Sequence, residues 1–122
     1  MPDRIVIADD HPIFRDGMRR IVQRASPNAL IFEASSAAEL LRVAADGVSP
    51  IMLVLDLVFP GFEGPLSIRR LRSEYPTTSL LVVSMTDDLD IIDQVMAAGA
   101  DGFIGKGVAA SEMASGIAAV LA

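Results

Sequence analysis

The sequence predicts an α/β fold, with one doubly wound parallel sheet in a single domain that spans residues 1–122. Two observations carry this prediction. Short apolar runs alternate five times with segments of helical periodicity, and the connections between them are short, as in repeated βαβ units. The runs "IMLVLD" and "LLVVS" are apolar at nearly every position, which is typical of parallel strands that helices cover on both faces.

The first five elements are three strands and two helices. Residues 4–8 (RIVIA), 30–34 (LIFEA) and 50–56 (PIMLVLD) are rich in aliphatic and β-branched residues, and each predicts a strand. Residues 12–25 begin with a proline, which favours the first turn of a helix, and they place an apolar stripe on one helical face. Residues 37–47 (AAELLRVAADG) predict a helix that its last glycine closes.

The second half of the chain continues the alternation. Residues 65–76 begin and end with proline, which predicts a helix bounded at both ends. Residues 80–84 (LLVVS) predict a buried strand, and residues 87–99 predict a helix that starts with acids suited to an N-cap and ends at a glycine. We expect a very short strand within 101–107 (DGFIGKG) and a last helix over 110–122.

Composition limits the function. Of the 122 residues, 52% are hydrophobic and 21% are charged, which suits one globular domain with a proper core. The net charge of −6 argues against binding of nucleic acid or of an anionic membrane by this domain. The absence of cysteine excludes disulfides, a thiol nucleophile and thiolate metal ligands. The apolar runs are too short for a signal peptide or a membrane span, so we expect a soluble, cytoplasmic protein.

Polar side chains stand at the carboxyl ends of the predicted strands. Asp9 and Asp10 follow the first strand, Asp56 ends the third, Ser84 ends the fourth, and Lys106 lies just beyond the fifth. Parallel strands share one carboxyl edge and lie about 4.8 Å apart, so we expect these side chains to meet there. Lys106 is the only lysine among the ten lysine and arginine residues, and its compact charge suits the approach to a phosphoryl group.

The charge of Asp56 inside an apolar run calls for a chemical reason, because burying an unpaired charge costs on the order of several kcal/mol. The three carboxylates also oppose one another's ionisation unless a cation joins them. Their oxygen atoms suit Mg²⁺, which readily shares phosphate oxygens as further ligands. Together with Mg²⁺ and Lys106, the acids form a nearly neutral site that can accept a phosphoryl group on Asp56.

Four motifs resemble the receiver domain of bacterial two-component response regulators: "IADDHPIFRDGM", "VLDLVFPGFEG", "LLVVSMTDD" and "GADGFIGKG". They occur in order over the whole chain. The resemblance implies a flavodoxin-like (βα)₅ fold with strand order 2-1-3-4-5. The opening "DDHPIFRDG" is similar to the NarL/FixJ class, whose receivers usually precede a LuxR-type helix-turn-helix DNA-binding domain. No such domain is present in this chain, so we interpret it as the receiver portion of a longer regulator.

The resemblance also implies roles for the acids. Asp56 is the expected phosphoacceptor, which takes a phosphoryl group from a phosphohistidine of a sensor histidine kinase. Asp10, Asp56 and the backbone carbonyl of Val58 are the expected ligands of Mg²⁺, and Asp9 the expected ligand through water. On this interpretation the domain is a signalling module and not an enzyme in its own right.

Three further residues have implied roles in phosphoryl binding and switching. Lys106 is expected to pair with the phosphoryl oxygens, Ser84 to swing its hydroxyl toward them, and Phe103 to occupy the aromatic switch position. The face of the fourth helix, fifth strand and fifth helix is then expected to change and control an output, and we also expect a homodimer modulated by phosphorylation. The bulk of Met85 narrows access to the phosphoryl group, and Val58 and Thr86 flank the site without a carboxylate or amide that orients a hydrolytic water. Both features predict a long-lived aspartyl phosphate.

Four alternatives stay open. The chain is alternatively a stand-alone receiver, or a pseudo-receiver that only dimerises, although it keeps all the acids and the lysine. A haloacid-dehalogenase-like phosphatase also uses Asp, Mg²⁺, Ser/Thr and Lys, but it needs D-x-D after its first strand, and here Leu57 and Val58 follow Asp56. A flavodoxin-like FMN binder needs a phosphate-binding loop after the first strand, which the sequence lacks.

The remaining charged candidates have simpler interpretations. His11, the only histidine, is expected to play a structural part in a turn. Asp87 and Asp88 are expected to be N-cap acids of the fourth helix. The cluster of Arg69, Arg70 and Arg72 is expected to form a solvated helix face.

Overall fold

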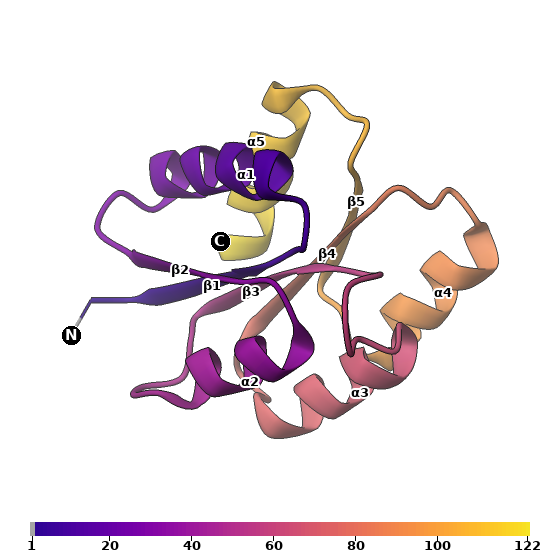
Figure 1. Cartoon of the computed structure of the whole chain (residues 1–122). Coiled ribbons are helices and arrows are strands. Elements are labelled where there is room, and N and C mark those ends of the chain that lie inside the picture. Colours follow the sequence, from indigo (N-terminus) through magenta and orange to yellow (C-terminus); the bar gives the residue numbers. More distant parts are fainter. Residues whose placement is uncertain (1) are drawn as a thin grey trace.

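The computed structural model describes residues 2–122 as one parallel sheet between two layers of helices (Figure 1). The strands are β1 (Arg4–Ala8), β2 (Leu30–Ala34), β3 (Met52–Asp56), β4 (Ser79–Ser84) and β5 (Gly102–Gly105). The helices are α1 (Pro12–Ala25), α2 (Ala37–Ala45), α3 (Pro65–Glu74), α4 (Leu89–Ala98) and α5 (Ala110–Leu121). The strand order β2-β1-β3-β4-β5 confirms the predicted α/β, flavodoxin-like topology.

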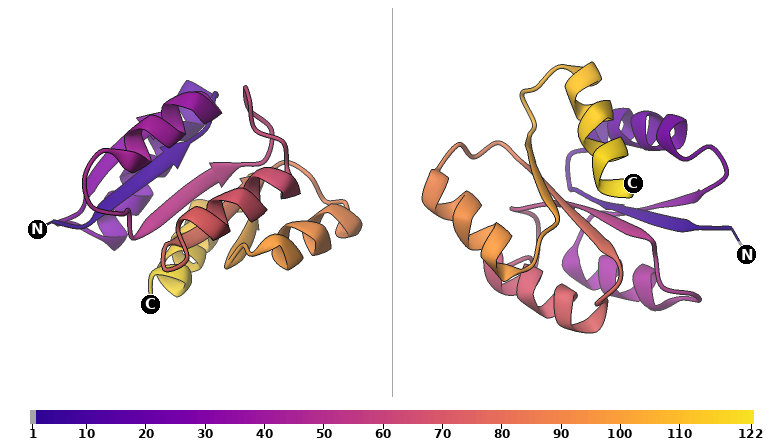
Figure 2. Two further views of the ribbon diagram at one scale, coloured as in Figure 1. Left: turned by 90° about the horizontal axis from the view of Figure 1, so that it is seen from below. Right: turned by 180° about the vertical axis from the view of Figure 1, so that it is seen from behind.

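The helices cover both faces of the sheet. Helices α1 and α5 lie on one face and α2, α3 and α4 on the other, as the front and back views show (Figures 1 and 2). Every residue of β1 and β3 is buried, so these central strands are apolar almost throughout. Each face has its own apolar cluster.

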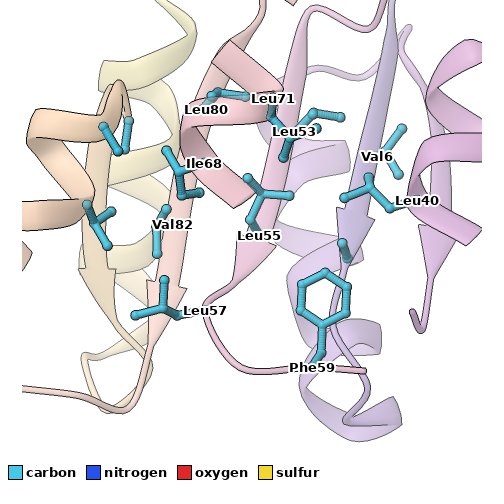
Figure 3. Packing of buried hydrophobic residues seen from close by; sticks show 14 of the residues in the cluster. Val6, Leu40, Leu53, Leu55, Leu57, Phe59, Ile68, Leu71, Leu80 and Val82 are labelled. Carbon is cyan, nitrogen blue, oxygen red and sulfur yellow. The ribbon is translucent and has the colours of Figure 1, made fainter. Parts of the chain in front are cut away.

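The larger cluster joins the sheet to α2, α3 and α4 (Figure 3). Leu40 of α2 lies beside Val6 of β1 in this cluster, and Ile68 of α3 lies in it together with Leu53 and Leu55 of β3. The cluster continues past the end of β3, because Leu57 is also buried in it. The core therefore fixes the segment after β3 as well as the strand itself.

The sheet reverses its winding between β1 and β3, and this reversal positions the polar residues. The chain moves from β1 outward to β2 and then returns to the other side of β1 to form β3. In the parallel register Ala8 lies opposite Leu55, so Asp9 and Asp56 follow at the same level of the sheet. Ligands of doubly wound folds bind at this kind of crevice.

The element boundaries differ from the predicted ones at capping residues. The strand predicted over 50–56 begins at Met52, two residues past Pro50, which has no backbone N–H to donate to a neighbouring strand. The helix predicted over 87–99 begins at Leu89, because the Asp88 side chain caps it by accepting from Asp90 N at 2.9 Å. The helices predicted over 37–47 and 65–76 end two residues early, at Ala45 and Glu74.

The interpretation of all three arginines of α3 as a solvated face is wrong for Arg72. Arg69 and Arg70 are exposed, but the Arg72 guanidinium donates to the Gly99 carbonyl from two nitrogens, at 2.8 and 3.0 Å. It also pairs with Asp101 at 2.6 Å. Arg72 therefore ties α3 to the connection between α4 and β5, a contact between distant segments that helical periodicity does not reveal.

Across residues 2–122, none of the helices is both long enough and apolar enough to span a bilayer.

Candidate functional site

Three carboxylates meet at the carboxyl edge of the sheet. Asp9 follows β1 and is 2% exposed, and Asp56 is the last residue of β3 and is 5% exposed. Asp10 is the exposed member of the group. One donor atom from each of these acids and one from His11 all lie within 4.8 Å of one another. The structure thus brings together the acids that the sequence predicts.

Backbone and side-chain contacts fix Asp9 in the cluster. Its N–H donates to the Ala34 carbonyl at the end of β2 at 3.0 Å, and its carbonyl accepts from the Arg15 guanidinium at 2.7 Å. Its carboxylate oxygen Oδ1 accepts from the His11 N–H at 2.8 Å. The start of α1 and the end of β2 together hold the buried carboxylate against Asp56.

Lys106 joins two of the acids. Its backbone N–H donates to the Ser84 carbonyl at 2.8 Å, which continues the pairing of β4 with β5 beyond the strand end. Its Nζ lies 3.1 Å from Asp56 Oδ2, as a hydrogen-bond donor, and 2.8 Å from Asp9 Oδ2. The lysine side chain is itself almost buried, so these ion pairs are largely shielded from water.

The other side of Lys106 contacts α1. Its ammonium lies 4.5 Å from the centre of the Phe14 ring, within the range of a cation–π contact. Lys106 and Phe14 also line a hollow between α1 and the start of α5. The lysine is therefore held between the acids and an aromatic ring.

The acids and the lysine change each other's proton affinity. Burial raises the pKa of Asp56 above its usual value of 3.8, and the negative charge of Asp9 adds to the rise, against the opposing hydrogen bond from Lys106. Burial alone would lower the pKa of Lys106, but its bonds to Asp9 and Asp56 outweigh burial and raise that pKa above 10.5. The lysine therefore stays charged, while charged Asp56 is held at an energetic cost.

The segment after β3 is anchored on both sides of Val58. Leu57 and Phe59 are buried, and the Val58 side chain between them is exposed. The Val58 N–H points back to Asp56 Oδ1 at 3.5 Å. The next residue but one, Pro60, accepts a hydrogen bond from Ala37 N at 2.8 Å. Alternation of buried and exposed residues thus keeps the Val58 backbone beside Asp56.

Ser84 and Phe103 lie on the neighbouring strands. Ser84 is buried at the end of β4, and its hydroxyl accepts from Thr86 N at 3.2 Å. Phe103 pairs with Val82 in the β4–β5 register and is partly buried against the cluster that α2, α3 and α4 cover. Ser84 is therefore at the edge with the acids, whereas Phe103 stands further back along β5.

The interpretation of His11 as a residue of the turn alone is incomplete. Its Nδ1 lies 2.9 Å from Asp9 Oδ1, 3.3 Å from Asp10 Oδ1 and 3.3 Å from Lys106 Nζ. The ring therefore belongs to the site. Phe14 belongs to the apolar stripe that the sequence predicts for residues 12–25, and its position in the first turn after Asp10 could have indicated contact with the site.

The residues present fit a divalent cation. Asp9 Oδ2 is buried, and its partner within the described part of the chain is the Lys106 ammonium, at 2.8 Å. The ammonium thus shows that positive charge is accommodated among the acids. Carboxylate oxygens with an open side are the donors that Mg²⁺ takes in proteins.

Comparison with known proteins gives one family. Residues 5–118 match the response regulator receiver domain. The chain is 31% identical over 118 residues to the glycerol metabolism activator of Pseudomonas putida, covering 97% of this chain and 53% of that protein. It is 28% identical over 105 residues to the nitrate/nitrite response regulator protein NarL of Escherichia coli K12, covering 86% of this chain and 48% of that protein. The chain thus spans about half the length of these two relatives.

A solved structure agrees with the sequence comparison. The two-component response regulator of the LuxR family from Aurantimonas sp. SI85-9A1 superposes with a TM-score of 0.85 at 31% identity. The superposition covers 99% of this chain and 86% of that one. The likeness therefore extends over all ten elements of the fold.

Proposed function

The chain belongs to the response regulator receiver domain family, with relatives of the NarL type, and from that premise we propose that it accepts a phosphoryl group on Asp56. One observation carries the proposal. The Asp56 carboxylate ends a buried strand, contacts the only lysine of the chain at 3.1 Å, and lies among two further carboxylates at the sheet edge. An aspartate kept at an energetic cost beside a cation is suited to chemistry more than to stability.

The proposed metal ligands are the carboxylates of Asp10 and Asp56 and the backbone carbonyl of Val58, with Asp9 acting through water. When Mg²⁺ is bound there, it supplies positive charge that offsets the acids and the incoming phosphate. Asp56, and Asp9 through water, would then hold the ion in place of their contacts to Lys106. The lysine ammonium is then free to pair with phosphoryl oxygens.

The proposed reaction is an in-line phosphoryl transfer. An Asp56 carboxylate oxygen forms a bond to phosphorus while the P–N bond of a phosphohistidine on a sensor histidine kinase breaks. The electron pair stays with the histidine nitrogen, which takes up a proton, and Asp56 becomes an aspartyl phosphate. Catalysis rests on positioning and charge, as in other phosphoryl transfers.

The proposed switch uses Ser84 and Phe103. The hydroxyl of Ser84 leaves Thr86 N to bond the new phosphate, and Phe103 moves toward the space that this opens. The face of α4, β5 and α5 then changes shape. Reversing a 1:99 population needs about 5.5 kcal/mol, which a few charge-assisted hydrogen bonds of roughly 1.5–3 kcal/mol each can supply.

The domain is a signalling module, and its proposed partners follow from the family. A sensor histidine kinase supplies the phosphoryl group in the cytoplasm, and the output is transcription through a LuxR-type DNA-binding domain. A homodimer modulated by phosphorylation is part of the same proposal. With a net charge of −6, this domain is not expected to contact DNA or membrane itself.

The test is stoichiometric phosphorylation by a small donor. Incubation with acetyl phosphate and Mg²⁺ should add about 80 Da to the intact protein, on Asp56, as a phosphorylated carboxylate. The D56N variant and a sample with excess chelator should not gain this mass. Continuous release of phosphate without a modified protein would indicate a phosphatase, and an unmodified wild-type protein would indicate a pseudo-receiver. Either result contradicts the proposal.

A further inference from the structure

His11 places a nitrogen atom among the carboxylate oxygens of the site, and we infer that this imidazole is a ligand of the divalent cation. The inference rests on the proposed function, because it concerns the same cation site. It changes the donor set from oxygen alone to oxygen with one nitrogen. Such a set binds Ni²⁺ and Co²⁺ more tightly than the acids alone would.

The spacing of the donors supports a shared coordination sphere. Adjacent ligands of an octahedral ion, each about 2.1 Å from the metal, lie about 3.0 Å apart. His11 Nδ1 lies 3.3 Å from Asp10 Oδ1 and 3.7 Å from Asp56 Oδ2, the two carboxylates proposed as direct ligands. It also lies 2.9 Å from Asp9 Oδ1, the carboxylate proposed to act through water. The nitrogen is thus within a few tenths of an ångström of the spacing between adjacent ligands, and a small shift would bring it into the coordination sphere.

The backbone holds the imidazole in place. His11 is the N-cap residue of α1, and Pro12 occupies the first helical turn. The His11 N–H donates to Asp9 Oδ1 at 2.8 Å, and its carbonyl accepts from Arg15 N at 2.9 Å. With both backbone groups bonded, the base of the side chain is fixed and Nδ1 faces the acids.

The second ring nitrogen, Nε2, can carry the single proton of the neutral imidazole while Nδ1 is unprotonated. A coordinating imidazole binds metal through an unprotonated nitrogen. The His11 side chain is 63% exposed, so water can accept a hydrogen bond from a protonated Nε2 while Nδ1 binds the ion. The Lys106 ammonium lies 3.3 Å from Nδ1 in this structure. A positive charge is thus already accommodated next to this nitrogen and the acids.

A comparison of Ni²⁺ and Mg²⁺ affinities distinguishes a histidine that coordinates the ion from one that does not. Imidazole suits Ni²⁺, Co²⁺ and similar ions, whereas carboxylate and water suit Mg²⁺. Loss of His11 should therefore weaken Ni²⁺ binding far more than Mg²⁺ binding. A histidine that only hydrogen-bonds Asp9 would affect both ions alike.

The experiment is calorimetric titration of untagged wild-type, H11A and D87N protein with MgCl₂ and NiCl₂. The H11A variant should lose roughly tenfold or more in Ni²⁺ affinity. Its Mg²⁺ affinity should fall by about threefold or less. D87N, which removes an exposed acid outside the cluster, should leave both affinities nearly unchanged. Thermal unfolding of each variant checks that it is folded.

A spectroscopic signature completes the test. Because His11 is the only histidine, a Co²⁺-loaded protein should show hyperfine-shifted, non-exchangeable imidazole C–H protons that are absent from H11A. Equal losses of Ni²⁺ and Mg²⁺ affinity in H11A, or no shifted imidazole C–H proton, would overturn the inference and leave the proposed function standing. Wild-type protein that binds neither ion would instead overturn both.

Discussion

Replacing Asp56 with asparagine should make the protein more stable in the absence of divalent cations. Asparagine keeps the volume of the side chain, and its amide oxygen can still accept a hydrogen bond from Lys106. It removes a negative charge that is only 5% exposed and lies beside other acids. The free energy of unfolding should therefore rise, because the negative charge of Asp56 serves the proposed function but destabilises the folded state.

The magnitude follows from the distances. At an effective dielectric constant of about 20, the attraction of Lys106 at 3.1 Å stabilises charged Asp56 by about 5 kcal/mol. Repulsion from Asp9, whose donor oxygen is within 4.8 Å, opposes it by about 3.5 kcal/mol, and Asp10 contributes about half of that because solvent screens it. Attraction and repulsion nearly cancel, so the cost of removing the charge from water decides the sign. We expect a net gain of about 1–2 kcal/mol in D56N, or roughly 3–8 °C in Tm.

Urea unfolding of the wild type and D56N at several pH values, with and without Mg²⁺, measures the effect. The raised pKa of Asp56 means that the folded state binds this proton more tightly than the unfolded state does. Charged Asp56 therefore costs stability above its raised pKa, and the cost disappears as the pH falls through that pKa toward 3.8. The gap between the two proteins should close in that window. Saturating Mg²⁺ should also narrow the gap, because the wild type binds it more tightly.

D101N is the matched control with the opposite sign. The Asp101 carboxylate pairs with Arg72 and accepts from the Leu80 N–H at 2.8 Å, and it belongs to no acid cluster. Its loss should destabilise the protein. A D56N protein that is less stable than the wild type near neutral pH without Mg²⁺, or a gap that does not shrink at low pH, would refute the reasoning.

Three further predictions concern the lysine, the rim of the site and a turn. K106M should be phosphorylated by acetyl phosphate roughly 10- to 150-fold more slowly, because it loses one charge-assisted hydrogen bond of about 1.5–3 kcal/mol; an unchanged rate in a mass-spectrometric time course would contradict this. Met85 is 75% exposed at the rim, and M85A should shorten the half-life of the aspartyl phosphate roughly fivefold, for a barrier change of about 1 kcal/mol; a wild-type half-life of only seconds would defeat the premise. G99A should lose about 2 kcal/mol or more of unfolding free energy, since Gly99 has φ +121° and an added Cβ would lie 2.8 Å from Arg72 Cγ. G107A, where nothing lies within 4 Å, should stay within about 0.5 kcal/mol of the wild type.

The sheet and its acidic edge could be predicted from the sequence because they depend on periodicity. A strand that is apolar on both faces, such as β3, has few other solutions than the centre of a parallel sheet. The polar residues after such strands must then gather at one edge. The structure shows Asp9, Asp10, Asp56 and Lys106 at this edge. Their gathering could be predicted without knowledge of side-chain rotamers.

The interpretations of Arg72 and His11 failed because they depend on the directions of the side chains, which the periodicity of the sequence does not indicate. Arg72 shares its helix with two exposed arginines, and only the crossing of α3 with the α4–β5 connection turns it into a tie to Gly99. His11 follows two acids in a turn, and its ring direction comes from the backbone angles before Pro12. Neither contact follows from the residue types alone, because each joins parts of the molecule whose relative placement is set by tertiary packing.

Lys106 connects the acidic site to the layer of α1 and α5. The same side chain that neutralises two acids also forms part of the wall of the hollow between α1 and α5, against Phe14. If Lys106 turns toward a phosphate on Asp56, as in the proposed function, its side chain would withdraw from that wall and the hollow between α1 and α5 would change shape. Phosphorylation would then alter the surface of the α1 and α5 layer as well as the strand that carries the aromatic switch position.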